Sequence, residues 1–335
     1  MLFVLKIGTM KNIAVIAGGN SGEYEVSLRT GENICKVLDR TLFNPYFIHF
    51  KGVDWTYIDE KGIVHNIDKN DFSLTVDNHK ITFDVAFIAI HGNPGEDGKL
   101  QGYFDMLQIP YTGCDLMTSA LTFNKYFCNL TAAHFGIPIA PSLLYHAGET
   151  VDKQEVERIC GYPCFVKPCN SGSSVGVTKV HAEDELAAAI KTAFDVDEYV
   201  MIEKFIPGRE VTCGTTKING KATALAVTEI ISKNEFYDFE SKYKADLHEM
   251  VTPADFPQPV LDEIMRYSEI FYKKTGMKGV VRMDYIITPD NKPFFLEVNT
   301  IPGQTALSII PHQIEHIGKD LKQVYTDIIL EALNN

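Results

Sequence analysis

Two hydrophobic segments near the C-terminus carry polar side chains at alternate positions, in residues 280–285 and 294–299. Alternate residues of a β-strand share a face, so Arg282 and Asp284 project together from the first segment. By the same rule Glu297 and Asn299 project together from the second. Carboxylate and amide oxygens suit Mg²⁺, which proteins usually hold with one or two carboxylates and the phosphates of a nucleotide. The alternative is a solvated sheet face with ordinary surface charges.

Residues 166–176 place a lysine directly before a loop of small residues. Lys167 ends an expected strand, and the loop behind it offers Ser173 and Ser174 between two glycines. One point charge and several backbone N–H groups suit a polyphosphate. The order differs from a Walker A loop, because the lysine precedes the glycines and no helix opens directly from them. A flexible surface hairpin is the alternative reading.

A third segment, residues 203–206, follows a hydrophobic strand and precedes a Pro-Gly turn. Backbone groups at this point could read the edge of an adenine, with Phe205 beside the ring. Glu210 could then accept a hydrogen bond from the ribose. By itself the pattern is weak, because many strands end in Glu-Lys.

Length and composition place these segments in a globular protein. The chain has 335 residues, of which 45% are hydrophobic and 22% charged, enough for two or three domains. The net charge of −13 argues against a nucleic acid or an anionic membrane as partner. The seven cysteines are scattered without zinc-site spacing, which suggests reduced thiols in a cytosol. We expect a cytoplasmic protein in which residues 1–10 are a dispensable extension.

Strands and helices alternate along the chain, which predicts an α/β fold. Residues 12–17 and 84–90 are expected to form buried strands, and each runs into a glycine-rich loop where ligand contacts would concentrate. One helix is expected over residues 119–135, in the passage out of the first unit. We expect an N-terminal domain over residues 1–118, a central unit over 119–206 and a C-terminal unit over 207–335.

Taken in order, the motifs resemble those of the ATP-grasp enzymes and closely match the D-alanine:D-alanine ligase family, over nearly the whole chain from Lys11. The segments that carry the resemblance are residues 22–27, 91–102, 110–113, 172–176, 237–243, 280–285 and 294–299, then Gly303, Ser308 and Pro311. The resemblance implies a Rossmann-like parallel N-terminal domain, followed by two α+β units that clamp ATP.

The resemblance also implies roles for individual residues in binding the nucleotide. ATP would lie between the central and C-terminal units, with two Mg²⁺ ions, for which Mn²⁺ would substitute. The metal ligands would be Asp284, Glu297 and Asn299. The residues around ATP would be Lys125, Lys167, Ser173, Ser174, Glu203, Lys204, Phe205, Ile206, Glu210 and Lys242.

For the amino acid substrates, the resemblance implies that Glu25 binds the ammonium of the first D-alanine, with His91 near its carboxylate. Ser308 would bind the carboxylate of the second D-alanine. Arg282 and the Gly303 N–H would stabilise the oxyanion. A further set of catalytic residues, Tyr243 and Ser173, would link to Glu25 and tie a mobile lid that carries Lys242 over the site.

The expected activity is ATP-dependent ligation of two D-alanine molecules through an acyl phosphate, in the supply of peptidoglycan precursors. The resemblance implies that Tyr243 favours D-alanine over D-lactate as second substrate. Ligation to D-lactate, another carboxylate–amine ligation and a non-catalytic ATP-binding regulator are the alternatives. The expected partners are D-alanine and ATP, and a homodimer is the default quaternary state.

Overall fold

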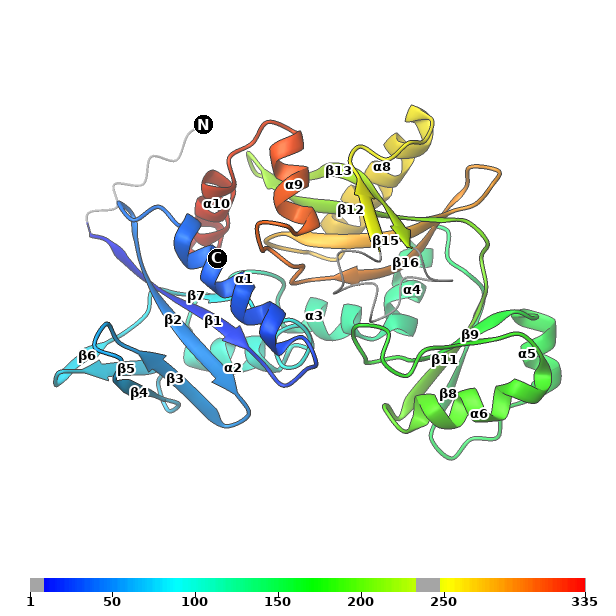
Figure 1. The fold of residues 1–335 in the computed structure, drawn as a ribbon, viewed down its shortest axis with the longest axis horizontal. Helices are drawn as coiled ribbons and strands as arrows, with labels where there is room; N and C mark the ends of the chain where they lie inside the picture. The colour runs from blue at the N-terminus through cyan, green and yellow to red at the C-terminus, as the bar shows by residue number, and fades with distance from the viewer. Residues whose placement is uncertain (1–8, 233–247, 335) are drawn as a thin grey trace.

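Three β-sheets follow one another along the chain in the computed structural model, which describes residues 9–232 and 248–334 (Figure 1). The first sheet has seven strands, the second four and the third five. Helices cover the sheets, so the α/β expectation is confirmed. No helix in the described ranges is both long and apolar enough to cross a membrane.

The first sheet has the strand order β6-β5-β4-β3-β2-β1-β7. Its strands are β1 (Lys11–Gly18), β2 (Phe43–Lys51), β3 (Asp54–Ile58), β4 (Val64–Asp68), β5 (Ser73–Val76), β6 (His79–Ile81) and β7 (Val85–Ile88). Only β2, β1 and β7 are parallel, as expected for the whole domain, whereas β3 to β6 form an antiparallel extension. Short turns such as residues 52–53 join these strands, and a turn of that length can only connect antiparallel neighbours.

The parallel centre of this sheet is buried because helices cover it. Residues 13–17 of β1 are 0–1% exposed. Helix α1 (Tyr24–Val37) packs against β1, and the last helix of the chain, α10 (Leu321–Leu333), packs against β7 (Figure 1). The Tyr325 ring of α10 lies 5.6 Å from the Phe87 ring. The C-terminal end of the chain therefore helps to form the core of its N-terminal sheet.

The helix expected over residues 119–135 is broken in two. Helix α3 (Leu116–Phe123) ends at Asn124, and α4 (Lys125–His134) begins directly after it. The Asn124 side chain accepts a hydrogen bond from the Phe127 N–H and caps α4. This break places Lys125 at the start of a helix instead of within one. α2 (Lys99–Leu107) precedes α3.

The second sheet is antiparallel and has the strand order β10-β9-β11-β8. Its elements are β8 (Ser142–His146), α5 (Lys153–Ile159), β9 (Cys164–Pro168), β10 (Thr178–Val180), α6 (Glu183–Phe194) and β11 (Tyr199–Lys204). In β9, Lys167 pairs with Met201 of β11, and Phe165 pairs with Glu203. The strand that carries the phosphate-type lysine therefore lies beside the strand that ends in the expected adenine hinge.

The third sheet is antiparallel and has the strand order β14-β13-β12-β15-β16. Its strands are β12 (Arg209–Ile218), β13 (Lys221–Ser232), β14 (His248–Val251), β15 (Val281–Ile287) and β16 (Pro293–Asn299), and α8 (Gln258–Lys274) and α9 (Ile309–His316) pack on it. Tyr285, Phe295 and Phe271 are fully buried in its core. Met283 and Tyr285 flank Asp284 in β15 and are buried in this core, so Asp284 projects from the other face. A register shift between β15 and β16 then pairs Glu297 with Asp284 and Phe295 with Tyr285.

Candidate active site

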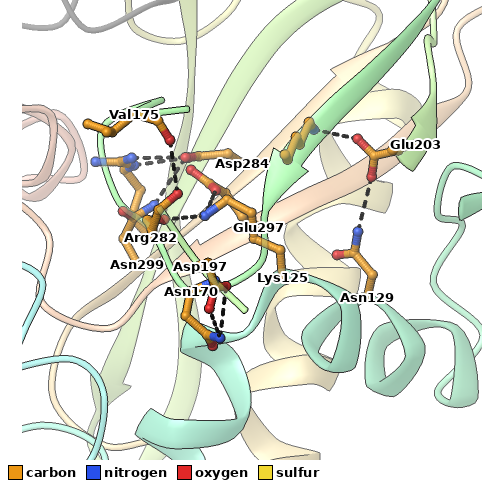
Figure 2. Close-up of polar contacts among 12 residues, drawn as sticks. Lys125, Asn129, Asn170, Val175, Asp197, Glu203, Arg282, Asp284, Glu297 and Asn299 are labelled. Carbon is orange, nitrogen blue, oxygen red and sulfur yellow. Dashed lines mark hydrogen bonds and ion pairs between the residues drawn. The ribbon is translucent and has the colours of Figure 1, made fainter. Parts of the chain in front are cut away.

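The two polar strand faces near the C-terminus meet, as the alternating pattern predicts. β15 and β16 are antiparallel neighbours whose register pairs Arg282 with Asn299 and Asp284 with Glu297. Arg282 donates from Nε and Nη2 to the two Asp284 carboxylate oxygens at 2.9 and 2.8 Å. The Asn299 amide donates to Asp284 Oδ2 at 3.1 Å, and Figure 2 shows these side chains converging. Their contacts make one charged cluster of Arg282, Asp284 and Asn299.

The donor chemistry of this cluster suits a hard divalent cation. Asp284 and Glu297 supply carboxylate oxygens, and the Asn299 amide nitrogen faces Asp284, which leaves its oxygen for a ligand. Thr212 Oγ1 also donates to Asp284 Oδ1 at 2.6 Å and orients that carboxylate. In the described ranges no group of three or more His, Cys, Asp or Glu side chains could hold a metal, so the third ligand here would be an amide.

A cavity of about 710 Å³, called the substrate cavity below, opens beside this cluster. Many of the predicted site residues line it, although they come from all three sheets. They are His91, Lys125, Ser173, Arg282, Glu297, Asn299, Gly303 and Ser308. The fold therefore brings together residues that lie more than 200 positions apart.

Glu25 does not lie in the substrate cavity, which corrects the prediction for that position. It is exposed in the first turn of α1, whereas Glu23, two residues earlier, lines the cavity. A Cβ added at Gly172 would lie 3.4 Å from Glu23 Oε2, and one at Gly92 would lie 3.9 Å from it. The Glu23 carboxylate thus sits between the 91–98 loop and the 166–176 loop. Helical rotation separates two glutamates that the sequence alone does not distinguish.

A second cavity of about 370 Å³, called the nucleotide cavity below, lies between the second and third sheets. Every described residue that was expected near ATP lines it. They are Lys125, Lys167, Ser173, Ser174, Glu203, Lys204, Phe205, Ile206 and Glu210. Lys125, Ser173 and Glu297 line both cavities, so the two cavities adjoin at these residues.

Two lysines of the nucleotide cavity, Lys125 and Lys167, are held in ion pairs. Lys167 Nζ lies 2.5 Å from Glu203 Oε2, and Asn129 donates to Glu203 Oε1 at 3.2 Å (Figure 2). Lys125 Nζ lies 3.4 Å from Glu297 Oε2 and also donates to the Ser171 carbonyl at 2.5 Å. These contacts fix both lysines at the edges of the cavity.

Ser173 and Ser174 lie at the turn of the small-residue loop. Both have left-handed backbone conformations, with φ of 51° and 58°. Successive backbone N–H groups in such a turn can form a concave anion site. Lys242 and Tyr243 lie outside the described residues. The predicted link of Tyr243 and Ser173 to Glu25 therefore includes a residue that the structure does not describe.

His91 lines the substrate cavity, but its ring nitrogens contact the protein. Nδ1 lies 2.7 Å from the Ile301 carbonyl, and Nε2 lies 3.0 Å from Thr30 Oγ1. Burial lowers the pKa of His91. These contacts argue against a direct bond from His91 to a substrate carboxylate.

Glu96, in the 91–98 loop, is a cavity residue that the sequence analysis missed. It is 8% exposed, and burial raises its pKa to about 7. Its oxygens accept hydrogen bonds from the Gly92 and Ile301 N–H groups, both at 2.8 Å. The density of charge in this loop was the available signal, but it did not distinguish Glu96 from Asp97.

Gly303 and Ser308 lie in the segment between β16 and α9. Ser308 Oγ accepts a hydrogen bond from the Thr305 N–H at 3.0 Å and lies 2.8 Å from Thr305 Oγ1. A Cβ added at Gly303 would lie 3.1 Å from Ser308 Oγ, so the missing side chain lets the two approach. Both residues line the substrate cavity.

Comparison with known proteins gives matches over almost the whole chain. The D-ala D-ala ligase N-terminus model matches residues 12–114, and the D-ala D-ala ligase C-terminus model matches residues 131–330. A D-alanine--D-alanine ligase from Parabacteroides distasonis is 45% identical over 325 residues, which are 97% of this chain and 98% of the relative.

Solved structures agree with these matches. D-alanyl-alanine synthetase A from Vibrio cholerae aligns with a TM-score of 0.88 at 30% identity, over 98% of this chain and 99% of that one. The VanG D-Ala:D-Ser ligase from Enterococcus faecalis aligns at 0.86 and 32%, over 97% and 100%. A Bacillus anthracis D-alanine--D-alanine ligase complexed with ATP aligns at 0.75 and 26%, over 96% and 97%. The chain belongs to the D-alanine–D-alanine ligase family.

Proposed function

We propose that this protein joins two D-alanine molecules to D-alanyl-D-alanine with cleavage of ATP to ADP and phosphate, for peptidoglycan synthesis. The observation that carries the proposal is the junction of the two cavities at Lys125 and Glu297, beside the Arg282 cluster, in a member of this ligase family. Such a junction would present the terminal phosphate of a nucleotide to a carboxylate in the neighbouring cavity.

The reaction has two balanced steps. The carboxylate of the first D-alanine attacks the γ-phosphorus of ATP, which gives an acyl phosphate and releases ADP. The amine of the second D-alanine attacks the acyl carbon, loses a proton, and expels inorganic phosphate as the amide bond forms. Because water would also attack the acyl phosphate, the cavity must exclude it.

Charged side chains in the substrate cavity suit these steps. Glu23, rather than Glu25, would bind the ammonium of the first D-alanine, because Glu23 lines the substrate cavity. Arg282 and the Gly303 N–H are suited to the negative charge that develops on the carbonyl oxygen. Ser308 is suited to the carboxylate of the second D-alanine, at the other end of the segment that carries Gly303.

Lys125, Lys167 and the 173–174 turn would hold the phosphates, and residues 203–206 with Glu210 would hold adenine and ribose. Asp284, Glu297 and Asn299 would hold two Mg²⁺ ions, with Mn²⁺ as a substitute. The bound cations would neutralise charge on the β- and γ-phosphates. We also propose domain boundaries near residues 118 and 206 and a cytoplasmic location. We further propose that the protein is a homodimer, and light scattering tests this quaternary state.

The second substrate has one specific alternative. The VanG protein, named as a D-Ala:D-Ser ligase, is 32% identical to this chain over 97% of its length. Because a relative with that specificity aligns so fully, D-serine is the alternative that competition assays must include. D-Lactate, another carboxylate–amine pair and a non-catalytic ATP-binding role are further outcomes of the same assay.

The test is ADP release from Mg-ATP with D-alanine, L-alanine, or D-alanine together with D-serine or D-lactate, and each product identified by mass. Release that depends on D-alanine and yields the dipeptide supports the proposal. A D-alanyl-D-serine or D-alanyl-D-lactate product formed in preference to the dipeptide would contradict the substrate assignment. Binding of ATP with no release for any D-amino acid would contradict the enzymatic role.

A further inference from the structure

The segment that follows β16 is held by residues that do not belong to the third sheet. Ile301 donates its N–H to Glu96 Oε1 at 2.8 Å, and its carbonyl lies 2.7 Å from His91 Nδ1. A carbonyl oxygen only accepts hydrogen bonds, so Nδ1 carries the proton and Nε2 faces Thr30 Oγ1. The N–H and the carbonyl of Ile301 are therefore both bound by side chains of the 91–98 loop, which follows the last strand of the first sheet.

Further contacts extend this arrangement to both sides of Gly303. Thr30 Oγ1 accepts from the Gln304 N–H at 3.4 Å, and Asn33 donates to the Gln304 carbonyl at 2.8 Å. Both residues lie on α1. Residues 301 and 304 are thus anchored on the N-terminal part of the fold, and Gly303 lies between the anchors.

The burial of the two anchoring side chains is costly. Glu96 is 8% and His91 is 4% exposed. A buried carboxylate without a directly paired cation is unfavourable unless backbone N–H groups bind it. Glu96 meets this need with two N–H groups from two separate loops, Gly92 and Ile301. An apolar side chain would cost less to bury, so stability alone does not account for a carboxylate here.

We propose that Glu96 and His91 are positioning residues that hold the Ile301 peptide groups from both sides and so fix the Gly303 N–H toward the reacting carbonyl. The inference rests on the proposed function, because it assumes that Gly303 binds the oxyanion. Donors of this kind act only when they are held in place before the reaction, and a displacement of about 1 Å can cost about 10²-fold in rate. Neither residue needs to touch a substrate.

Glu96→Gln tests the first contact, since the variant keeps the shape and replaces one acceptor oxygen by an NH₂ group that must face a backbone N–H. We expect kcat for dipeptide formation to fall about 10- to 100-fold, while KM for ATP changes less than twofold. The matched control is Glu331→Gln. Glu331 accepts a hydrogen bond from the Gly279 N–H at 3.2 Å, and it lines neither cavity. That control should change kcat less than twofold. A Glu96→Gln enzyme with full kcat would overturn the proposal.

His91→Asn and His91→Gln test the second contact without removing Glu96. The asparagine amide nitrogen can replace Nδ1 and still donate to the Ile301 carbonyl, whereas the glutamine amide nitrogen can replace Nε2 and reach Thr30 instead. We expect the asparagine variant to keep a kcat at least fivefold above that of the glutamine variant, at equal KM for ATP. Equal kcat values, or the opposite order, would overturn the proposal.

The same assays separate the two proposals. Wild-type enzyme that forms no dipeptide would refute the proposed function, whatever the variants do. Active wild type with unaffected variants would refute the positioning role alone. If Glu96→Gln lowers the melting temperature and weakens ATP binding, the comparison of the two His91 variants decides the question.

Discussion

The two cavities of this protein are built in different ways. The nucleotide cavity lies between two antiparallel sheets, and charged groups that line it lie on adjacent strands, such as Lys167 on β9 and Glu203 on β11. The substrate cavity collects side chains from the first helix, two glycine-rich loops, the third sheet and the segment before α9. The alternation of residues along strands can therefore locate a site such as the nucleotide cavity, whereas the substrate cavity depends on how distant loops pack.

This comparison predicts a larger loss of activity from changes at the junction than from changes within either cavity. Combining Asp284→Asn with Glu297→Gln should lower kcat at least about 10³-fold, because two proposed metal ligands lose their charge. Steady-state ADP release measures the effect. As a control, Asp290→Asn with Asp262→Asn removes two exposed carboxylates of the same region and should leave kcat within twofold. Full activity of the first double variant would refute the metal assignment.

The substrate cavity can be tested by comparing its two candidate glutamates. Glu23→Gln should lower kcat/KM for the first D-alanine about 10²-fold, because a charge-assisted bond to the ammonium is lost. Glu25→Gln is the matched control and should stay within twofold, since Glu25 is exposed outside the cavity. The opposite result would restore Glu25 as the ammonium partner and contradict the placement of Glu23.

The nucleotide cavity should respond in a different kinetic constant. Lys167→Met should raise KM for ATP about tenfold, because one charged contact to a phosphate is lost, and should leave KM for D-alanine unchanged. Lys191→Met removes an exposed lysine of α6 and serves as the control. A change in KM for D-alanine of equal size would show that the two cavities do not act separately.

The smallest effect concerns stability. Burial raises the pKa of Glu96 from 4.5 to about 7. Between these two pH values the folded state therefore binds a proton that the unfolded state does not. The Glu96 contribution to the free energy of unfolding should therefore fall by about 1 kcal/mol between pH 6 and pH 8. Denaturant unfolding of wild type and Glu96→Gln at both pH values measures the difference. A gap between the two proteins that does not change with pH would contradict the raised pKa.

Much of the fold could be predicted from local pattern. The strand expected over residues 12–17 lies within β1, and the strand expected over residues 84–90 contains β7. The break between α3 and α4 was missed, because the apolar pattern continues across Asn124 while its side chain caps the second helix. The antiparallel extension of the first sheet was missed as well, because its strands are short and partly exposed.

The site could be predicted to the extent that its residues share a strand or a short loop. Arg282 with Asp284, and Glu297 with Asn299, follow from a period of two residues, and the structure pairs the two strands. Glu23 and Glu25 have the same chemistry and nearly the same position in the chain, so no local rule separates them. Glu96 acquires its importance only through Ile301, which lies 205 residues away.

The α/β class, the family, and the types and local faces of the groups that can bind phosphate and metal could all be predicted from the sequence, because these depend on side-chain chemistry and backbone period. Only the tertiary structure decided which glutamate enters the substrate cavity, that the cavities meet at Lys125 and Glu297, and that the N-terminal loop holds the segment around Gly303. The physical reason is that burial, helix rotation and contacts between distant loops arise from the packing of the whole chain.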